Sequence, residues 1–345
     1  MNINHSFHIP VMGLAYTVDT PVKVAHLGIS SVISIVDDYL VEKMREFYSR
    51  KMNLPFKGIP LKSDDSRARR IKAYLDLVDQ MVSRKFEELI ENFQQKGSEL
   101  ERYFELLPNA DTVREKFRQI SRSEGLQEVK KWLRSNLRPG SIDVNIMTKL
   151  DKVNFRGEEA LPAEHNDAHA ALRGFATSTL SSSLVLSAGM NPRLYGYLEQ
   201  FNDFFPGPDG QLRKKITLKV SDYRSALIQG RFLAKKGIWV SEYRVESGLN
   251  CGGHAFASQG HLLGPILHEF REKRNELIKT VFSLYQKALQ EKDKAVPGLP
   301  PDIKVTAQGG IGTSEEHRFL LEEYRLDSIG WGSPFLLVPE VCKLD

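Results

Sequence analysis

Eight short runs rich in valine and isoleucine recur along the chain, each followed by glycine, serine or aspartate and then by a helical pattern. This alternation predicts strand–helix units, because a buried parallel strand is a short apolar run whose crossover is usually a helix. The runs occupy residues 7–14, 31–36, 141–148, 182–189, 215–221, 238–245, 302–310 and 327–335. Eight such units predict an α/β fold, a closed (β/α)₈ barrel of the TIM type.

One connection between the predicted strands is much longer than the others. Residues 38–140 have a helical pattern nearly throughout, and in residues 71–93 the apolar positions step by three or four. These positions are Ile71, Leu75, Val78, Val82, Phe86, Leu89 and Phe93. We therefore expect residues 1–37 and 141–345 to form the barrel and residues 38–140 to form an inserted helical subdomain. The basic cluster RARR at 67–70 is expected to be a solvated helix start.

The composition narrows the classes of function. Hydrophobic residues make up 41% of the chain and charged residues 27%, as in soluble globular proteins. A net charge of only +4 does not favour nucleic acid as a partner. Two distant cysteines, Cys251 and Cys342, indicate neither a disulfide framework nor a zinc site. With no signal-peptide pattern and no apolar stretch of about 20 residues, we expect a cytoplasmic protein without a membrane partner.

After the last predicted strand, too few residues remain to form an eighth outer helix. We expect either that further domains follow this segment in a longer polypeptide, or that another element closes the barrel.

Glycine-rich turns follow the last two predicted strands. Gly309, Gly310 and Gly312 leave backbone N–H groups accessible to an anion, and Thr313 with Glu316 has the spacing of a capping box at a helix start. Gly332 and Ser333 follow the eighth run. In barrels of this type the loops after strands seven and eight often hold a phosphate group, so we expect a phosphate cradle here.

A histidine follows two glycines directly after the sixth predicted strand. Gly252 and Gly253 would let a flat ligand lie against bare backbone beside His254, whose imidazole can give or take a proton near neutral pH. His165 and His169 are four residues apart, as in a zinc helix, but the glutamate of H-E-x-x-H is missing. We therefore expect a surface helix there and no metal site.

Several segments, taken in order, resemble the flavin-dependent barrels of the nitronate monooxygenase (2-nitropropane dioxygenase) family, which includes flavin-dependent enoyl-acyl-carrier-protein reductases. The segments are IPVMG, DVNIM, SAGMNP, GLNCGGH, AQGGIGT and SIGWGSPF, and the resemblance spans about 240 residues outside the helical segment. Three positions depart from the family pattern. Where the family has a glycine pair after its first helix, this sequence has LGISSV. The family's glutamate before Ala-Gly-Gly is Asn250 here, and its Thr-Arg pair after the last glycine is Ser333-Pro334.

The resemblance implies an FMN site and a role for each matching residue. According to the resemblance, Met12, Gly13 and Gly189 would lie against the flavin ring, and Asn145 would hydrogen-bond its polar edge. Lys219 would point toward the same mouth if the strand register holds. Gly252 and Gly253 would pass beneath the ribityl chain. The phosphate would be held by Gln308, Gly309, Gly310, Gly332 and Ser333. His254 matches the family's proposed catalytic base.

The resemblance implies an FMN-dependent oxidoreductase that acts on a small-molecule substrate. Two substrate classes remain open: a nitronate, or an enoyl thioester that would also require NAD(P)H as electron donor. A different class of function also remains open, in which the barrel is a module of a larger protein and acts mainly through partner binding.

Overall fold

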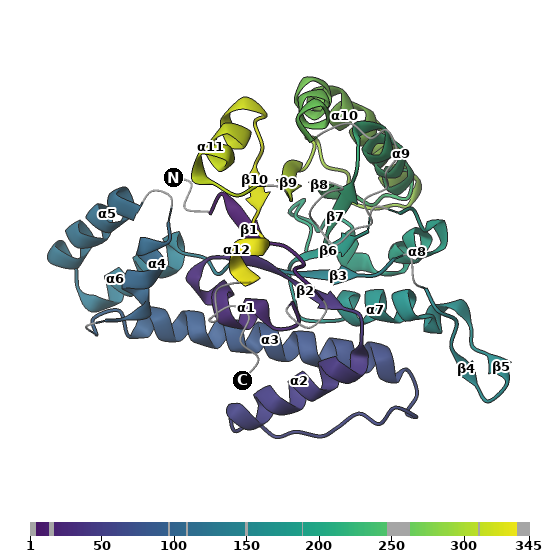
Figure 1. Ribbon diagram of the computed structural model, residues 1–345, viewed down its shortest axis with the longest axis horizontal. Coiled ribbons are helices and arrows are strands. Elements are labelled where there is room, and N and C mark those ends of the chain that lie inside the picture. The colour runs from purple at the N-terminus through teal and green to yellow at the C-terminus, as the bar shows by residue number, and fades with distance from the viewer. Residues whose placement is uncertain are drawn as a thin grey trace.

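The computed structural model describes residues 5–13, 17–95, 97–107, 110–148, 151–187, 189–246, 263–309 and 311–336. Eight parallel strands form a closed barrel in the order β1-β10-β9-β8-β7-β6-β3-β2 (Figure 1). They are β1 (Phe7–Ile9), β2 (Ser30–Ile35), β3 (Ile142–Ile146), β6 (Ser183–Leu186), β7 (Lys215–Val220), β8 (Val240–Glu246), β9 (Lys304–Gln308) and β10 (Ser328–Gly330). The predicted eight-stranded α/β barrel is confirmed, and each strand overlaps its predicted run.

Helices connect the strands around the barrel. Outside residues 38–140 they are α1 (Thr20–Val24), α7 (Asp167–Ala176), α8 (Pro192–Tyr197), α9 (Tyr223–Ala234), α10 (Leu263–Glu291), α11 (Ser314–Glu323) and α12 (Ser333–Leu336). Between β2 and β3 lie α2 (Asp38–Lys51), α3 (Ser66–Glu91), α4 (Glu99–Glu105), α5 (Ala110–Ser123) and α6 (Leu126–Asn136). A small antiparallel hairpin, β4 (Phe155–Arg156) and β5 (Glu159–Ala160), projects from the loop between β3 and α7 (Figure 1).

The predicted apolar stripe of residues 71–93 lies on α3 and just beyond it. Its side chains are buried from Ile71 to Leu89, and Phe93 is partly buried. The first two thirds of α3 share one apolar core with the barrel strands, whereas Phe86 and Leu89 pack in a second core with α4 and α6. Helix α3 is therefore both the crossover helix between β2 and β3 and the support for α4–α6, which lie at one end of it (Figure 1).

The RARR cluster lies at the start of α3, as expected, but only Arg69 of its three arginines is exposed, so the expectation of a solvated cluster was wrong for Arg67 and Arg70. Arg70 is 3% exposed and donates to the backbone oxygen of Ile59, and both Arg67 and Arg70 pair with Asp38, at 2.8 and 3.0 Å. Asp38 begins α2, so these ion pairs join the N-terminal ends of α2 and α3.

The strands present different chemistry on their two faces. Outward side chains such as Ile33, Val144, Leu218 and Tyr243 belong to the apolar core beneath the helices. Side chains alternate along a strand, so the other set faces the barrel interior. That set is mostly polar and includes His8, Ser34, Asp143, Asn145, Thr217, Lys219, Glu242, Arg244, Glu246, Thr306 and Gln308. A polar interior departs from the bulky branched residues that usually fill such barrels.

Candidate functional site

The inward side chains nearest the carboxyl ends of the strands form the candidate site, called here the mouth residues: Ser34, Asn145, Lys219, Glu246 and Gln308. The strand register supports this grouping, because Ser34 is paired with Asn145 and Glu246 with Gln308 on neighbouring strands. Active sites of such barrels lie at this end.

Glu246 connects two of the mouth residues. Its Oε1 accepts a hydrogen bond from Gln308 Nε2 at 2.9 Å and lies 3.4 Å from Lys219 Nζ. The side chains of Lys219 and Glu246 keep only 16% and 15% of their exposure, so the ion pair is largely withdrawn from solvent. A charged pair at the end of a barrel offers both a cation and an anion to a ligand in the mouth.

Asn145 is buried and only half satisfied. Its Nδ2 donates to Ser34 Oγ at 3.3 Å, while its Oδ1 is buried without a hydrogen-bond partner. An unmade hydrogen bond on a buried polar atom costs roughly 1–3 kcal/mol. A ligand with an N–H or O–H group directed at Oδ1 would recover that cost.

His8 lies in the interior beside Gln308. Its Nδ1 is 3.2 Å from Ser328 Oγ, and the side chain is 5% exposed. Burial lowers the pKa of His8 from 6.5 to about 3, with a further lowering by Arg244. The imidazole is therefore neutral at ordinary pH. Gln308 lies close enough to His8 to favour its charged form slightly, but their facing atoms do not form a hydrogen bond of good geometry.

A charged layer lies nearer the amino ends of the strands. Arg244 Nε donates to Glu242 Oε1 at 2.8 Å, Thr306 Oγ1 donates to the same oxygen at 2.5 Å, and Asp143 lies 3.8 Å from Arg244. Burial alone would raise the pKa of Glu242, but Arg244 and His8 lower it to about 2. Burial raises the pKa of Asp143 despite the opposing effect of Arg244.

Two glycines near the mouth differ in how much room they have. A Cβ on Gly330 would lie 2.6 Å from Gln308 Cβ and 2.9 Å from His8 Nε2, whereas a Cβ on Gly332 would meet Pro10 and Met12 at ordinary contact distances of 3.7 and 4.0 Å. Gly330 is therefore required for the packing of His8 and Gln308.

Gly330→Ala should lower the free energy of unfolding by about 1–3 kcal/mol, because the added methyl group overpacks the interior. Gly332→Ala, the matched control, should change it by less than about 0.5 kcal/mol. Urea unfolding of both variants measures this difference. Equal losses in the two variants would contradict the packing described for Gly330.

The loop after β9 is only partly available to a phosphate. The predicted capping box is confirmed, since Thr313 accepts from Glu316 N and the Glu316 side chain returns to the start of α11. The same carboxylate accepts from Gly312 N at 2.8 Å and Thr313 N at 3.1 Å. The expectation that Gly312 offers a free N–H group was therefore wrong, because Glu316 already fills that place.

The other predicted residues are distributed as follows. Gly13 follows β1 and accepts a hydrogen bond from Thr17 N, Gly189 follows β6, and Met12 packs against a small apolar cluster beside Gly332. Gly309 follows β9 with a φ of 90°, and Ser333 begins α12. His254, Gly252, Gly253 and Gly310 lie outside the described residues, and their predicted roles stay predictions.

His169 was expected on the surface of a helix, but it is buried, so that expectation was wrong. It is 2% exposed, and its Nδ1 lies 2.7 Å from Asp151, which precedes α7. Helix α7 packs against α3, and most of its side chains are buried. Within the part of the chain that the structure describes, no three His, Cys, Asp or Glu residues are grouped so that they could hold a metal ion.

The sequence reasoning did not identify His8, Ser34 or Glu246 as mouth or interior residues. One signal was present in VSEYRVE, where Glu242, Arg244 and Glu246 alternate with Tyr243 and Val245. Such alternation places all three charges on one face of a strand. In a barrel covered by helices, the face opposite the apolar one is the interior.

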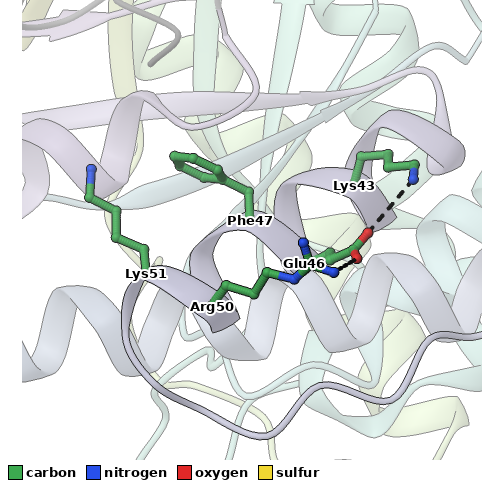
Figure 2. Close-up of a pocket in the computed structure, with 5 residues that line it drawn as sticks. All are labelled: Lys43, Glu46, Phe47, Arg50 and Lys51. Atoms are coloured by element: carbon green, nitrogen blue, oxygen red, sulfur yellow. Dashed lines mark hydrogen bonds and ion pairs between the residues drawn. The ribbon is translucent and has the colours of Figure 1, made fainter.

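A separate depression of about 630 Å³ lies on α2 and is lined by Lys43, Glu46, Phe47, Arg50 and Lys51 (Figure 2). Lys43 and Arg50 both pair with Glu46, at 3.7 and 2.6 Å. Their side chains are 56% and 75% exposed, so these are ordinary surface ion pairs of small energy. The mouth residues are the stronger candidate because they are buried or half-buried, and because Asn145 and Gln308 each have a buried oxygen without a hydrogen-bond partner.

No protein-family model fits the chain, and no curated protein is significantly similar to it. None of the described helices is both long enough and apolar enough to cross a membrane.

Proposed function

We propose that the chain is an FMN-dependent oxidoreductase of the nitronate monooxygenase type, with the flavin at the mouth of the barrel. One observation carries the proposal: Asn145, Lys219 and Gln308, each expected from the family resemblance, face the interior at the carboxyl ends of three different strands. Their common placement at one end of the barrel depends on the strand register, on which the expectation for Lys219 was conditional.

The residues present fit the polar edge of a flavin ring. Asn145 Oδ1 is a buried acceptor without a partner, which suits a ring N–H group, and Lys219, on another strand of the same barrel end, supplies a cation. When bound, FMN would supply the electron and hydride transfer. The protein's own part is to orient the ring through Asn145 and to place charge with Lys219.

Fewer backbone N–H groups are available to hold the FMN phosphate than the sequence suggested. Gly309 and Gly332 remain as backbone positions just after two neighbouring strands, β9 and β10, in which Gln308 is paired in register with Gly330. The N–H groups of Gly312 and Thr313 are occupied by Glu316. The proposed phosphate site therefore lies between the ends of β9 and β10 and does not extend to the start of α11.

FMN should bind to the purified protein, and its fluorescence should be quenched as protein is titrated into the FMN solution. Asn145→Ala should weaken FMN binding about tenfold, the loss of one buried hydrogen bond. Asn202→Ala, at an exposed asparagine in the segment that precedes the start of β7, serves as the control and should bind FMN like the original protein. Equal affinities in the two variants would remove Asn145 from the site, and a protein that does not bind FMN would overturn the proposed function.

In the same assay series, His254→Ala should leave FMN binding intact and slow turnover of a nitronate by roughly 10² to 10⁴ if His254 is the general base.

A further inference from the structure

We propose that Glu246 is a positioning residue of the barrel mouth, which fixes the amide orientation of Gln308 and holds Lys219 beside it. The inference rests on the proposed function for its ligand, but it concerns contacts within this chain. Neither the sequence patterns nor the family resemblance assigns a role to Glu246.

The orientation of the Gln308 amide follows from hydrogen-bond chemistry. An ionised carboxylate can only accept, so the group of Gln308 that faces Glu246 at 2.9 Å must be the amide N–H. The carbonyl oxygen of Gln308 is thereby turned toward His8, where it is buried and has no hydrogen bond of good geometry. At 2% exposure Gln308 has no solvent to replace this partner.

The same carboxylate oxygen also restrains Lys219. The distance from Lys219 Nζ to Glu246 Oε1 is 3.4 Å, and neither side chain keeps more than 16% of its exposure. A lysine on a flexible stem would otherwise extend into solvent. Glu246 thus joins β7, β8 and β9 at their carboxyl ends, and it determines where a ligand in the mouth meets the cation of Lys219.

Two substitutions separate these roles. Glu246→Gln keeps an acceptor for Gln308 but removes the charge that holds Lys219, and Glu246→Leu removes both. Glu199→Gln is a matched control, because Glu199 also bridges two cations, Lys236 and Lys292, each at 2.6 Å, but belongs to the segment between β6 and β7 that precedes the start of β7.

The first readout needs no flavin. In protein labelled with ¹⁵N-glutamine, the Gln308 side-chain amide, assigned with Gln308→Glu, should give separated and slowly exchanging proton signals. These signals should collapse toward those of exposed amides in Glu246→Leu, and they should persist in Glu246→Gln and in Glu199→Gln. Unchanged Gln308 signals in Glu246→Leu would overturn the inference, whether or not the protein binds FMN.

The second readout is FMN affinity. Glu246→Leu should weaken FMN binding at least about tenfold, Glu246→Gln by a smaller factor, and Glu199→Gln should leave it unchanged. A purely structural role for Glu246 predicts lower thermal stability in Glu246→Leu with FMN affinity retained, and that result would overturn the positioning role. If the original protein binds no FMN, the proposed function fails and the amide signals alone decide the inference.

Discussion

Replacing Arg244 with methionine is expected to lower the free energy of unfolding by about 3–5 kcal/mol, the cost of leaving buried charges without their partner. Arg244 is 2% exposed, donates to Glu242 at 2.8 Å and lies 3.8 Å from Asp143. Methionine fills much of the same volume, so the loss would come from the two carboxylates and not from a cavity. Urea unfolding measures it directly.

Two controls test that explanation. Arg134→Met breaks an ion-pair network with Glu87 and Glu91, but Arg134 is 41% exposed, so this change should have a far smaller effect. Adding Glu242→Gln to Arg244→Met should recover a substantial part of the lost stability, because it removes one stranded charge. If Arg244→Met costs no more than Arg134→Met, the charged layer is solvated and the polar interior described here is incorrect.

Acidification should destabilise the protein through His8 well before the carboxylates titrate. The pKa of His8 is lowered from 6.5 to about 3 in the folded chain, so the unfolded chain binds the extra proton between these values. Stability is therefore fully present above pH 6.5 and falls as the pH falls, by up to about 5 kcal/mol at pH 3. Between pH 7 and 5 the expected loss from His8 is about 2 kcal/mol.

The measurement compares the protein with His8→Gln in urea unfolding at pH 7, 6 and 5. His5, His26 and His317 also have lowered pKa values, from burial in each case, and contribute to the slope of both proteins. The difference in slope isolates His8, and His8→Asn repeats the test if His8→Gln folds poorly. Parallel slopes would show that His8 is not held neutral in the interior.

The strands could be predicted from the sequence because each contains a short run rich in valine and isoleucine, followed by turn residues and a helical pattern. The same holds for the buried stripe of α3 and for the capping box of Thr313 and Glu316, which depend on residues a few positions apart. Features of this kind require no knowledge of the barrel register.

What the sequence did not reveal depends on partners far apart in the chain. The buried Arg70 pairs with Asp38, which is 32 residues away in the sequence. The buried His169 lies against Asp151, which precedes its helix. The link between Glu246 and Gln308 spans 62 residues and exists only in the register of β8 with β9. Gly312 was misjudged for a different reason: the carboxylate that caps α11 also occupies the N–H groups expected to bind an anion.

A flavin at the mouth of this barrel would be visible in the absorption spectrum of the purified protein after incubation with FMN and removal of the excess. We expect retained bands near ~370 and ~450 nm, which bleach on reduction of the bound flavin. A colourless protein after this treatment would contradict the proposed flavin site.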